Sequence, residues 1–122
     1  MTVQELYEQI DGNYEAAKKI MMMDQMISRF IVKFADDKSY ERLKAAGETM
    51  DAAALFESAH TLKGVAANLG LTKLSTMASE ITEEYRPGQE RSMTDEQVKE
   101  KLEAISAQYA KTVEGIRAFA QN

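Results

Sequence analysis

The one histidine of the sequence lies in a stretch whose spacing suits phosphoryl chemistry. The stretch runs from Ser58 to Gly70 and contains His60, Lys63 and Gly64. A neutral imidazole is a competent nucleophile near physiological pH. Residues three apart are neighbours on a helix, so the Lys63 ammonium can offset the charge of a phosphoryl group on His60. The pattern therefore predicts a residue that can receive a phosphoryl group and hand it on.

This chemistry requires a helix that turns His60 toward solvent. When each residue turns the helix by about 100°, the apolar positions fall within roughly 40° of Leu55. These positions are Leu55, Ala59, Leu62, Ala66 and Leu69. His60 falls roughly 140° from Leu55, outside this stripe. We therefore expect an exposed His60, with Lys63, Gly64 and Ala67 on its side of the helix.

Gly64 is unusual because a glycine inside a helix costs about 1 kcal/mol relative to alanine. It does not end the helix, since the apolar stripe continues beyond it to Leu69. A residue without a side chain, one turn beyond the histidine, leaves room for the close approach of a partner. Phe56, Glu57 and Ala67 are the candidate docking residues on this face, although Phe56 and Glu57 could equally be ordinary rim residues.

The sequence lacks the groups that hydrolases, kinases and most metal enzymes use. It has no cysteine, no second histidine, no phosphate-cradling glycine loop and no kinase signature. Met21–Met23 and Met26 could bind copper, but methionines at helical spacing more often fill a core. Asp36-Asp37 and Glu83-Glu84 could be metal ligands or acid/base pairs. The two side chains of each pair point about 100° apart on a helix, however, which favours a solvated surface. We expect no metal site, no cofactor of the protein's own and no ATP-dependent kinase activity.

The patterning predicts an all-α fold, an antiparallel four-helix bundle with additional short N-terminal helices, in one domain over residues 1–122. Only one proline and six glycines interrupt the chain, and no strand-like alternation is present. The core helices are expected at roughly 21–35, 51–69, 71–85 and 94–120. A short helix ending near Gly12 should precede them. Residues 13–20 form either a second short helix or the start of the helix at 21–35.

Capping residues indicate where these helices begin and end. Two pairs have the spacing of a capping box: Thr2 with Glu5, and Thr94 with Gln97. Asp51 is a suitable N-cap for the central helix, and Gly70 should end that helix. Thr72 is a candidate cap for the next helix, and the short connection makes the two helices antiparallel neighbours. A shorter helix after residues 36–38 should stop at Gly47.

Net charge and hydropathy limit which partners and which cellular location we expect. The net charge of −5 argues against binding to a nucleic-acid backbone. No apolar run approaches the length of a membrane span, and the N-terminal residues Met1–Glu5 do not resemble a secretory leader. The absence of cysteine fits a reducing compartment. We expect a cytoplasmic monomer that binds neither nucleic acid nor membrane.

The stretch His60-Thr61-Leu62-Lys63-Gly64, followed by Leu69-Gly70, resembles the signature of the histidine-containing phosphotransfer (HPt) domains of bacterial two-component phosphorelays. The resemblance covers most of the chain and implies a four-helix bundle with the histidine exposed at mid-helix. It implies that His60 is the phospho-acceptor, that Lys63 stabilises the phosphoryl group and that Gly64 gives a partner room to dock. The implied partners are receiver domains of response regulators or of a hybrid histidine kinase, which bring the magnesium and most catalytic groups.

Two other interpretations stay open at this stage. The phospho-accepting domain of chemotaxis-type histidine kinases has a similar signature, so the chain could be an excised piece of a longer kinase. An acidic helical bundle could also be an adaptor that binds partners without phosphoryl chemistry. The spacing of His60, Lys63 and Gly64 favours phosphoryl chemistry over an adaptor. The absence of a kinase module favours a free-standing carrier over an excised piece of a kinase.

Overall fold

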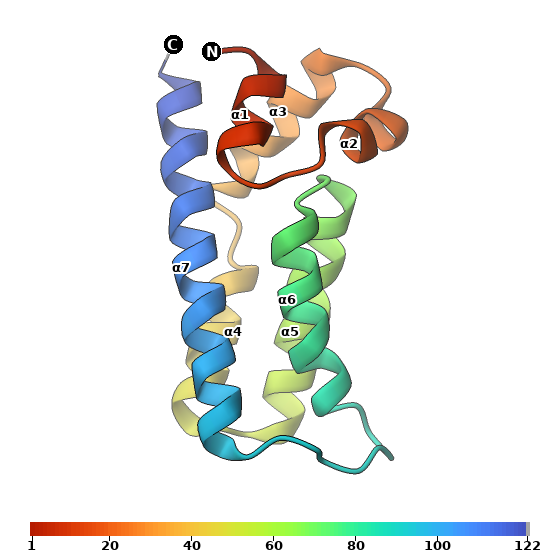
Figure 1. The fold of residues 1–122 in the computed structure, drawn as a ribbon, viewed down its shortest axis with the longest axis vertical. Helices are drawn as coiled ribbons and strands as arrows, with labels where there is room; N and C mark the ends of the chain where they lie inside the picture. The colour runs from red at the N-terminus through yellow and green to blue at the C-terminus, as the bar shows by residue number, and fades with distance from the viewer. Residues whose placement is uncertain (122) are drawn as a thin grey trace.

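The computed structural model describes residues 1–121, which form seven helices and no strand (Figure 1). The helices are α1 (Val3–Gln9), α2 (Tyr14–Met21), α3 (Asp24–Phe34), α4 (Ser39–Thr49), α5 (Ala52–Asn68), α6 (Thr72–Glu84) and α7 (Asp95–Ala120). The predicted all-α class is confirmed. The helices expected at 51–69, 71–85 and 94–120 correspond to α5, α6 and α7.

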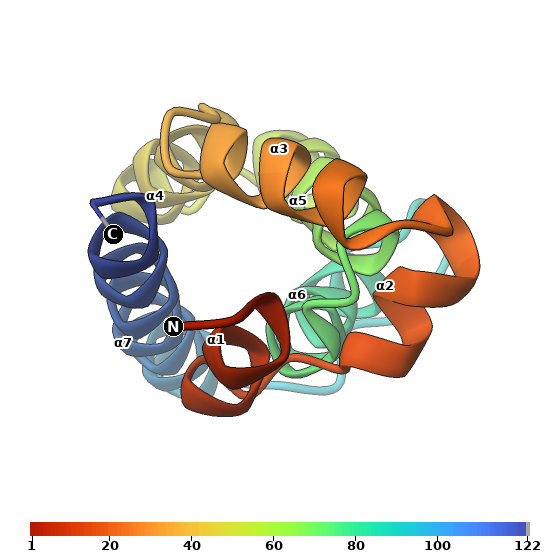
Figure 2. The same cartoon turned by 90° about the horizontal axis from the view of Figure 1, so that it is seen from above.

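Four helices pack in a ring along the long axis of the molecule. α5 packs against α4 and α6, and α7 packs against both α6 and α4. The three N-terminal helices lie at the end of this ring that is remote from the α6–α7 loop (Figures 1 and 2). α7 is long enough to pack against α1 and α3 as well as against α4 and α6. The α5–α6 hairpin therefore lies on the side of the molecule opposite the α4–α7 pair.

The core helix expected at 21–35 needs correction. Met22 has a φ of 73°, which a right-handed helix cannot continue, so α2 ends at Met21 and α3 begins separately at Asp24. The helix beside α5 is α4, whereas α3 packs with α1, α2 and α7. Met22 and Met23 occupy the exposed turn at 71% and 53% exposure, so the interpretation of these methionines as core filler is wrong. Phe30, within the range of the expected core helix, is exposed as well.

The predicted helix ends are confirmed where a side chain caps the backbone and wrong at two other positions. Both capping boxes form, and the Asp51 carboxylate accepts the backbone N–H of Ala54 at 2.9 Å. Thr72 does not cap α6, which begins without a side-chain cap. Gly47 does not stop α4, because its bare backbone lies against α7, where an added Cβ would be 3.0 Å from Leu102 Cδ1. α4 ends two residues later, before Met50, which has a φ of 56°.

Gly70 joins the N-terminal helices to the turn of the α5–α6 hairpin. Its φ of +71° ends α5, and its carbonyl accepts the N–H of Asn13 at 2.7 Å. The buried Tyr7 hydroxyl donates to the carbonyl of the preceding Leu69 at 2.6 Å. A Cβ on Gly70 would approach Asn13 O to 2.7 Å and Ala17 Cβ to 2.9 Å. The turn is thus closed over by α2 and cannot accept a side chain without movement.

Substitution of Gly70 should therefore destabilise the fold. We expect Gly70→Ala to lower the free energy of unfolding by about 2 kcal/mol or more, because it combines a left-handed φ with backbone collisions. Urea unfolding followed by circular dichroism measures the change. The matched control is Gly64→Ala, which adds the same methyl group to a helix where no atom lies within 4 Å. It should raise the stability by up to about 1 kcal/mol. Equal effects of the two variants would contradict this account of the turn.

Candidate functional site

His60 lies on the exposed side of α5, as its helical position predicts. The apolar stripe behind it is buried, with Leu55, Ala59, Leu62 and Ala66 each at 0% exposure. These side chains pack between α4 and α6, so the imidazole is left on the outer surface. The predicted exposure of His60 is confirmed.

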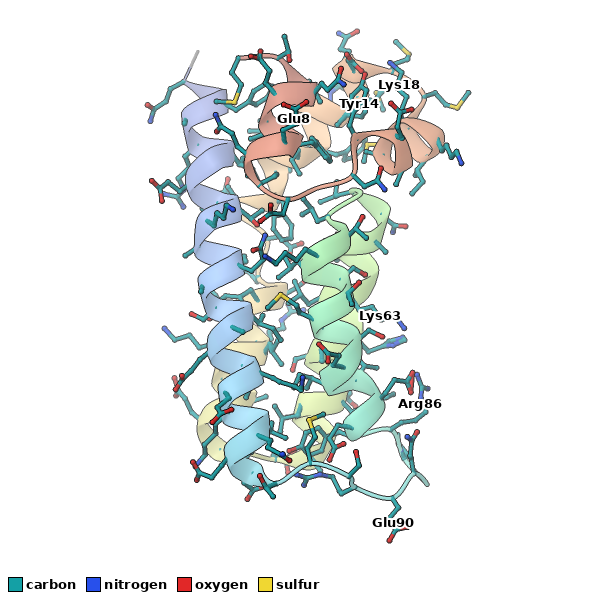
Figure 3. All side chains as sticks on the ribbon, in the orientation of Figure 1. Glu8, Tyr14, Lys18, Lys63, Arg86 and Glu90 are labelled. Atoms are coloured by element: carbon teal, nitrogen blue, oxygen red, sulfur yellow. The ribbon has the colours of Figure 1, made fainter. Side chains whose placement is uncertain are left out.

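Lys63 and Gly64 follow His60 by one turn on α5. The half-buried Lys63 side chain projects from the α5–α6 hairpin (Figure 3). It forms no ion pair within residues 1–121, so its charge is uncommitted there. A Cβ added to Gly64 would meet nothing within 4 Å. The helix surface beside His60 is therefore open.

A shallow hollow adjoins Lys63 on the α6 side. It has a volume of about 490 Å³ and is lined largely by polar side chains of α6, including Ser75, Ser79 and Glu83. The Ser75 hydroxyl donates to the carbonyl of Lys63 at 3.1 Å, which fixes the register of the two helices at this level. The hollow therefore lies next to Lys63, a cation that forms no ion pair among residues 1–121.

Phe56 and Arg86 extend the site toward the end of α6. The Phe56 ring is stacked on the His60 imidazole, with centroids 5.7 Å apart and planes inclined by 14°. The Arg86 guanidinium carbon lies 5.6 Å from the Phe56 centroid. Arg86 is in turn held by Glu83 through two bonds, Nε to Oε2 at 2.7 Å and Nη2 to Oε1 at 2.9 Å. Figure 3 shows Arg86 on the same side of the hairpin as Lys63.

The pKa of Glu83 reflects the charged groups around it. The hydrogen bonds from Arg86 lower the pKa of the Glu83 carboxyl, against a smaller opposing effect of burial. The charges of Arg86, Lys63 and His60 lower this pKa further. Glu83 is therefore within electrostatic reach of both predicted site residues on α5. Glu83 and Arg86 were not predicted as site residues, although their three-residue spacing is a signal for an ion pair on one helix face.

The remaining predicted docking residues are both exposed. Glu57 and Ala67 lie on α5 on either side of His60 along the helix. Neither is covered by another part of the described chain, so this face is free over several turns of α5. Their contact with a partner stays a prediction.

The interpretation of the acidic pair at residues 83–84 as a solvated surface is wrong for Glu84. Its side chain is only 2% exposed and binds the loop that follows α6. Its carboxylate accepts the backbone N–H of Met93 at 2.8 Å, Arg91 Nε at 2.7 Å and the Ser92 hydroxyl at 2.9 Å. Burial alone raises the pKa of Glu84, but these donors outweigh it and lower the pKa to about 2. Glu84 thus anchors the loop that begins at Arg86.

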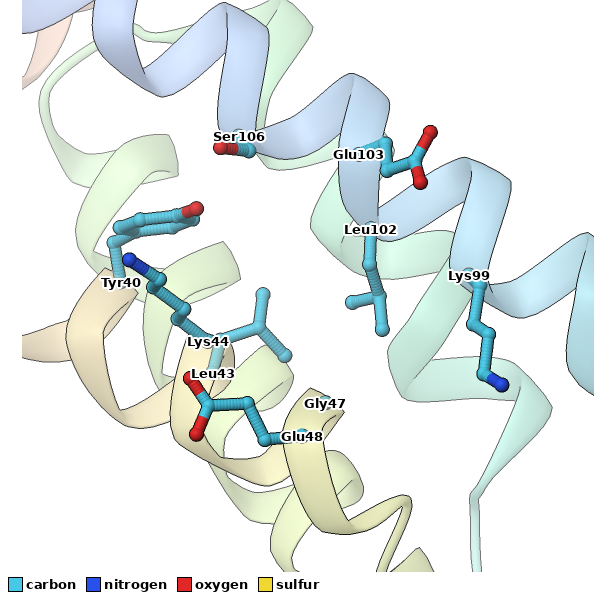
Figure 4. A pocket seen from close by; sticks show the side chains of 9 residues that line it. All are labelled: Tyr40, Leu43, Lys44, Gly47, Glu48, Lys99, Leu102, Glu103 and Ser106. Atoms are coloured by element: carbon cyan, nitrogen blue, oxygen red, sulfur yellow. The ribbon is translucent and has the colours of Figure 1, made fainter.

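A second hollow, of about 300 Å³, lies between α4 and α7 (Figure 4). Tyr40, Leu43 and Leu102 provide its apolar part, and Lys44 and Glu103 are among the charged residues at its rim. None of the predicted site residues lines it. Residues 1–121 contain no group of three or more His, Asp or Glu side chains that could hold a metal ion. None of the helices formed by these residues combines the length and apolar character that crossing a bilayer requires.

Comparison with known families gives one match. The family model described as the Hpt domain matches residues 25–108, more than half of the chain. This range contains His60, Lys63, Gly64, Glu83 and Arg86. No curated protein and no solved structure matches the chain.

The buried Glu84 should make stability depend on pH. Its pKa is about 2 in the folded protein and near 4.5 when exposed, so its contribution is complete above pH 4.5 and is lost as the pH falls toward 2. We expect Glu84→Gln to lower the free energy of unfolding by about 2 kcal/mol at pH 7. The gap from wild type should narrow between pH 4.5 and pH 2, as measured by urea unfolding. Glu83→Gln, on the exposed side of α6, is the control and should change stability little. A gap that stays constant over this interval would contradict the proposed anchoring.

Proposed function

The chain belongs to the Hpt domain family, whose members transfer phosphoryl groups in two-component phosphorelays, and from this premise we propose a specific role for His60. His60 accepts a phosphoryl group from the phospho-aspartate of one receiver domain and passes it to another receiver. The observation that carries the proposal is the exposure of the only histidine, within the matched segment, beside an uncommitted lysine and an open glycine.

The transfer step uses the lone pair of the neutral His60 imidazole. A nitrogen–phosphorus bond forms while the bond between phosphorus and the aspartyl oxygen breaks, and the aspartate leaves as a carboxylate. The proton on the other ring nitrogen remains, so the product is a phosphoimidazolium. Passing the group on reverses these bond changes at the next receiver. Such transfers depend chiefly on positioning and on neutralising the charge of the phosphoryl oxygens.

Lys63 and Gly64, the neighbours of His60, contribute to charge neutralisation and to positioning. Lys63 lies three residues from His60, one turn along α5, so its ammonium can offset the phosphoryl charge. It forms no ion pair with a carboxylate among the described residues. Gly64 leaves the helix surface low where the partner's aspartate must approach. Magnesium and the other catalytic groups belong to the receiver in this proposal. The chain carries the group and has no kinase activity of its own.

The proposal extends to the assembly and location of the protein. We propose a monomer, since the open face around His60 is then left free for the receiver. We propose a cytoplasmic location, in keeping with a chain that contains no cysteine. Its upstream donor is a receiver domain of a hybrid histidine kinase or of a response regulator.

Phosphorylation should depend entirely on His60. Incubation of wild-type protein with a phosphorylated receiver should give acid-labile phosphate on the chain, and His60→Gln should give none. Phos-tag electrophoresis before and after acid treatment measures this. Because the imidazole is exposed, His60→Gln should keep wild-type stability, which urea unfolding checks. Equal labelling of His60→Gln would refute the assignment. Partner binding that survives His60→Ala, with no transfer by wild type, would identify an adaptor instead.

Bulk at Gly64 should slow transfer without harming the fold. We expect Gly64→Gln to reduce the transfer rate about tenfold or more, because its side chain occupies the space needed for close approach. Its free energy of unfolding should stay within about 1 kcal/mol of wild type, since no atom lies near the site of the added side chain. Rapid-quench measurement of transfer from a phosphorylated receiver gives the rate. Transfer at the wild-type rate would exclude the close-approach role of Gly64.

A further inference from the structure

Phe56 contacts two side chains, the His60 imidazole and the Arg86 guanidinium. Its ring stacks on the His60 imidazole and also lies beneath the Arg86 guanidinium at 5.6 Å, within the range of a cation–π contact. Arg86 does not hang freely at that distance, because Glu83 binds it through two parallel hydrogen bonds. We refer to Phe56, Glu83 and Arg86 together as the Phe56 support. It links the end of α6 to the imidazole on α5 through three consecutive contacts between side chains.

We propose that the Phe56 support positions the His60 imidazole for phosphoryl transfer, so that Phe56 and Arg86 are positioning residues. The proposal rests on the proposed function of His60 and deepens it. It also assigns Phe56 differently from the sequence analysis, which treated that residue as a docking contact or a rim residue.

Stacking on Phe56 limits how the His60 imidazole can rotate. An exposed histidine on a helix can rotate about two side-chain bonds, and most of the resulting orientations do not point a ring nitrogen at an incoming phosphorus atom. A ring stacked on the imidazole at an inclination of 14° restricts rotation about the second bond. The stack occupies one face of the imidazole and leaves the ring edge accessible on the exposed surface. The same contact thus orients the nucleophile and keeps it available.

The planar guanidinium group makes Arg86 suited to hold Phe56. The guanidinium is a planar fork that matches a carboxylate with two bonds, so pairing with Glu83 fixes its plane as well as its position. A planar cation can lie over an aromatic ring while both hydrogen bonds are kept. The loop that begins at Arg86 is itself anchored by the buried Glu84. The support therefore has a rigid base at the end of α6.

Arg86 also offsets the negative charge of Glu83 near His60. Glu83 is close enough to His60 and Lys63 for their charges to act on it, so a bare Glu83 carboxylate would oppose a phosphoryl dianion on His60. The bidentate pair neutralises that carboxylate through Arg86 and leaves Lys63 uncommitted for the phosphoryl group. Loss of Arg86 would remove the ring support and expose an opposing charge together.

The support can be tested in the free protein by proton NMR. The chain has one histidine, so its ring protons give signals that need no assignment among residues. In wild type the stacked Phe56 should displace these shifts from the values of an unstructured histidine. Arg86→Gln should move them toward those values, although Arg86 does not touch the imidazole. Arg42→Gln, which alters an exposed arginine on α4, is the matched control and should leave them unchanged. Unmoved shifts in Arg86→Gln would overturn the proposal.

Single-turnover transfer from a phosphorylated receiver separates positioning from docking. We expect Arg86→Gln and Phe56→Leu to lower the saturating rate about 3- to 10-fold with little change in the half-saturating receiver concentration. Phe56→Tyr, which keeps the stacked ring, should restore the rate; Arg86→Lys, which lacks the planar fork, should not. A raised half-saturating concentration at an unchanged saturating rate would overturn the proposal in favour of docking. Failure of wild type to accept phosphate would refute the proposed function instead, and the NMR result would still decide whether the support exists.

Discussion

The burial of one side of α5 is the constraint on which the site depends. Leu55, Ala59, Leu62 and Ala66 are fully buried between α4 and α6, and the two alanines allow close packing on both sides. Turning α5 by a single residue, about 100°, would expose the leucines and bring His60 inward. Each exposed leucine would cost about 2 kcal/mol, and the buried imidazole would need hydrogen-bond partners. The direction of His60 is therefore held by hydrophobic burial on the opposite side of its own helix.

The remainder of the molecule keeps this helix from shifting along its neighbours. Ser75 binds the Lys63 carbonyl in the middle of the α5–α6 hairpin, and Tyr7 and Asn13 bind carbonyls at its turn. At the other end of α6, Glu84 secures the loop toward α7. The N-terminal helices, which contribute no side chain to the site, thus act by closing the turn around Gly70. Rigid attachment at both ends lets an exposed face carry groups in fixed positions.

The parts of the site that lie on one helix could be predicted from the sequence, because helical periodicity alone relates them. His60, Lys63 and Gly64 are related in this way, and the buried stripe beneath them follows the same period. The Phe56 support could not be predicted, since the contact between Arg86 and Phe56 depends on how far α6 runs alongside α5 before its loop begins. Glu84 was misjudged for the same reason, because its burial comes from the return of residues 91–93 over the end of α6.

The errors in the fold have a similar origin. The capping boxes were predictable because donor and acceptor are three residues apart in the sequence. The break at Met22 carried no such signal, since methionine rarely adopts a positive φ and a run of three methionines suggests a continuous apolar stripe. Gly47 was taken for a helix stop, whereas its function is to let α7 approach α4. At Gly47, therefore, a contact made far along the chain overrides the local preference.

The charge of the whole chain makes the local arrangement at His60 more important. A protein of net charge −5 repels a negatively charged phosphoryl group at long range. At physiological ionic strength this repulsion is screened beyond about 8 Å, so charges next to the imidazole dominate once the partner is in contact. There the Glu83 carboxylate, on which the charge of His60 acts, is already paired with Arg86, while Lys63 is not paired within the described residues. An acidic carrier can thus receive a dianion because its positive charge is placed at the point of transfer.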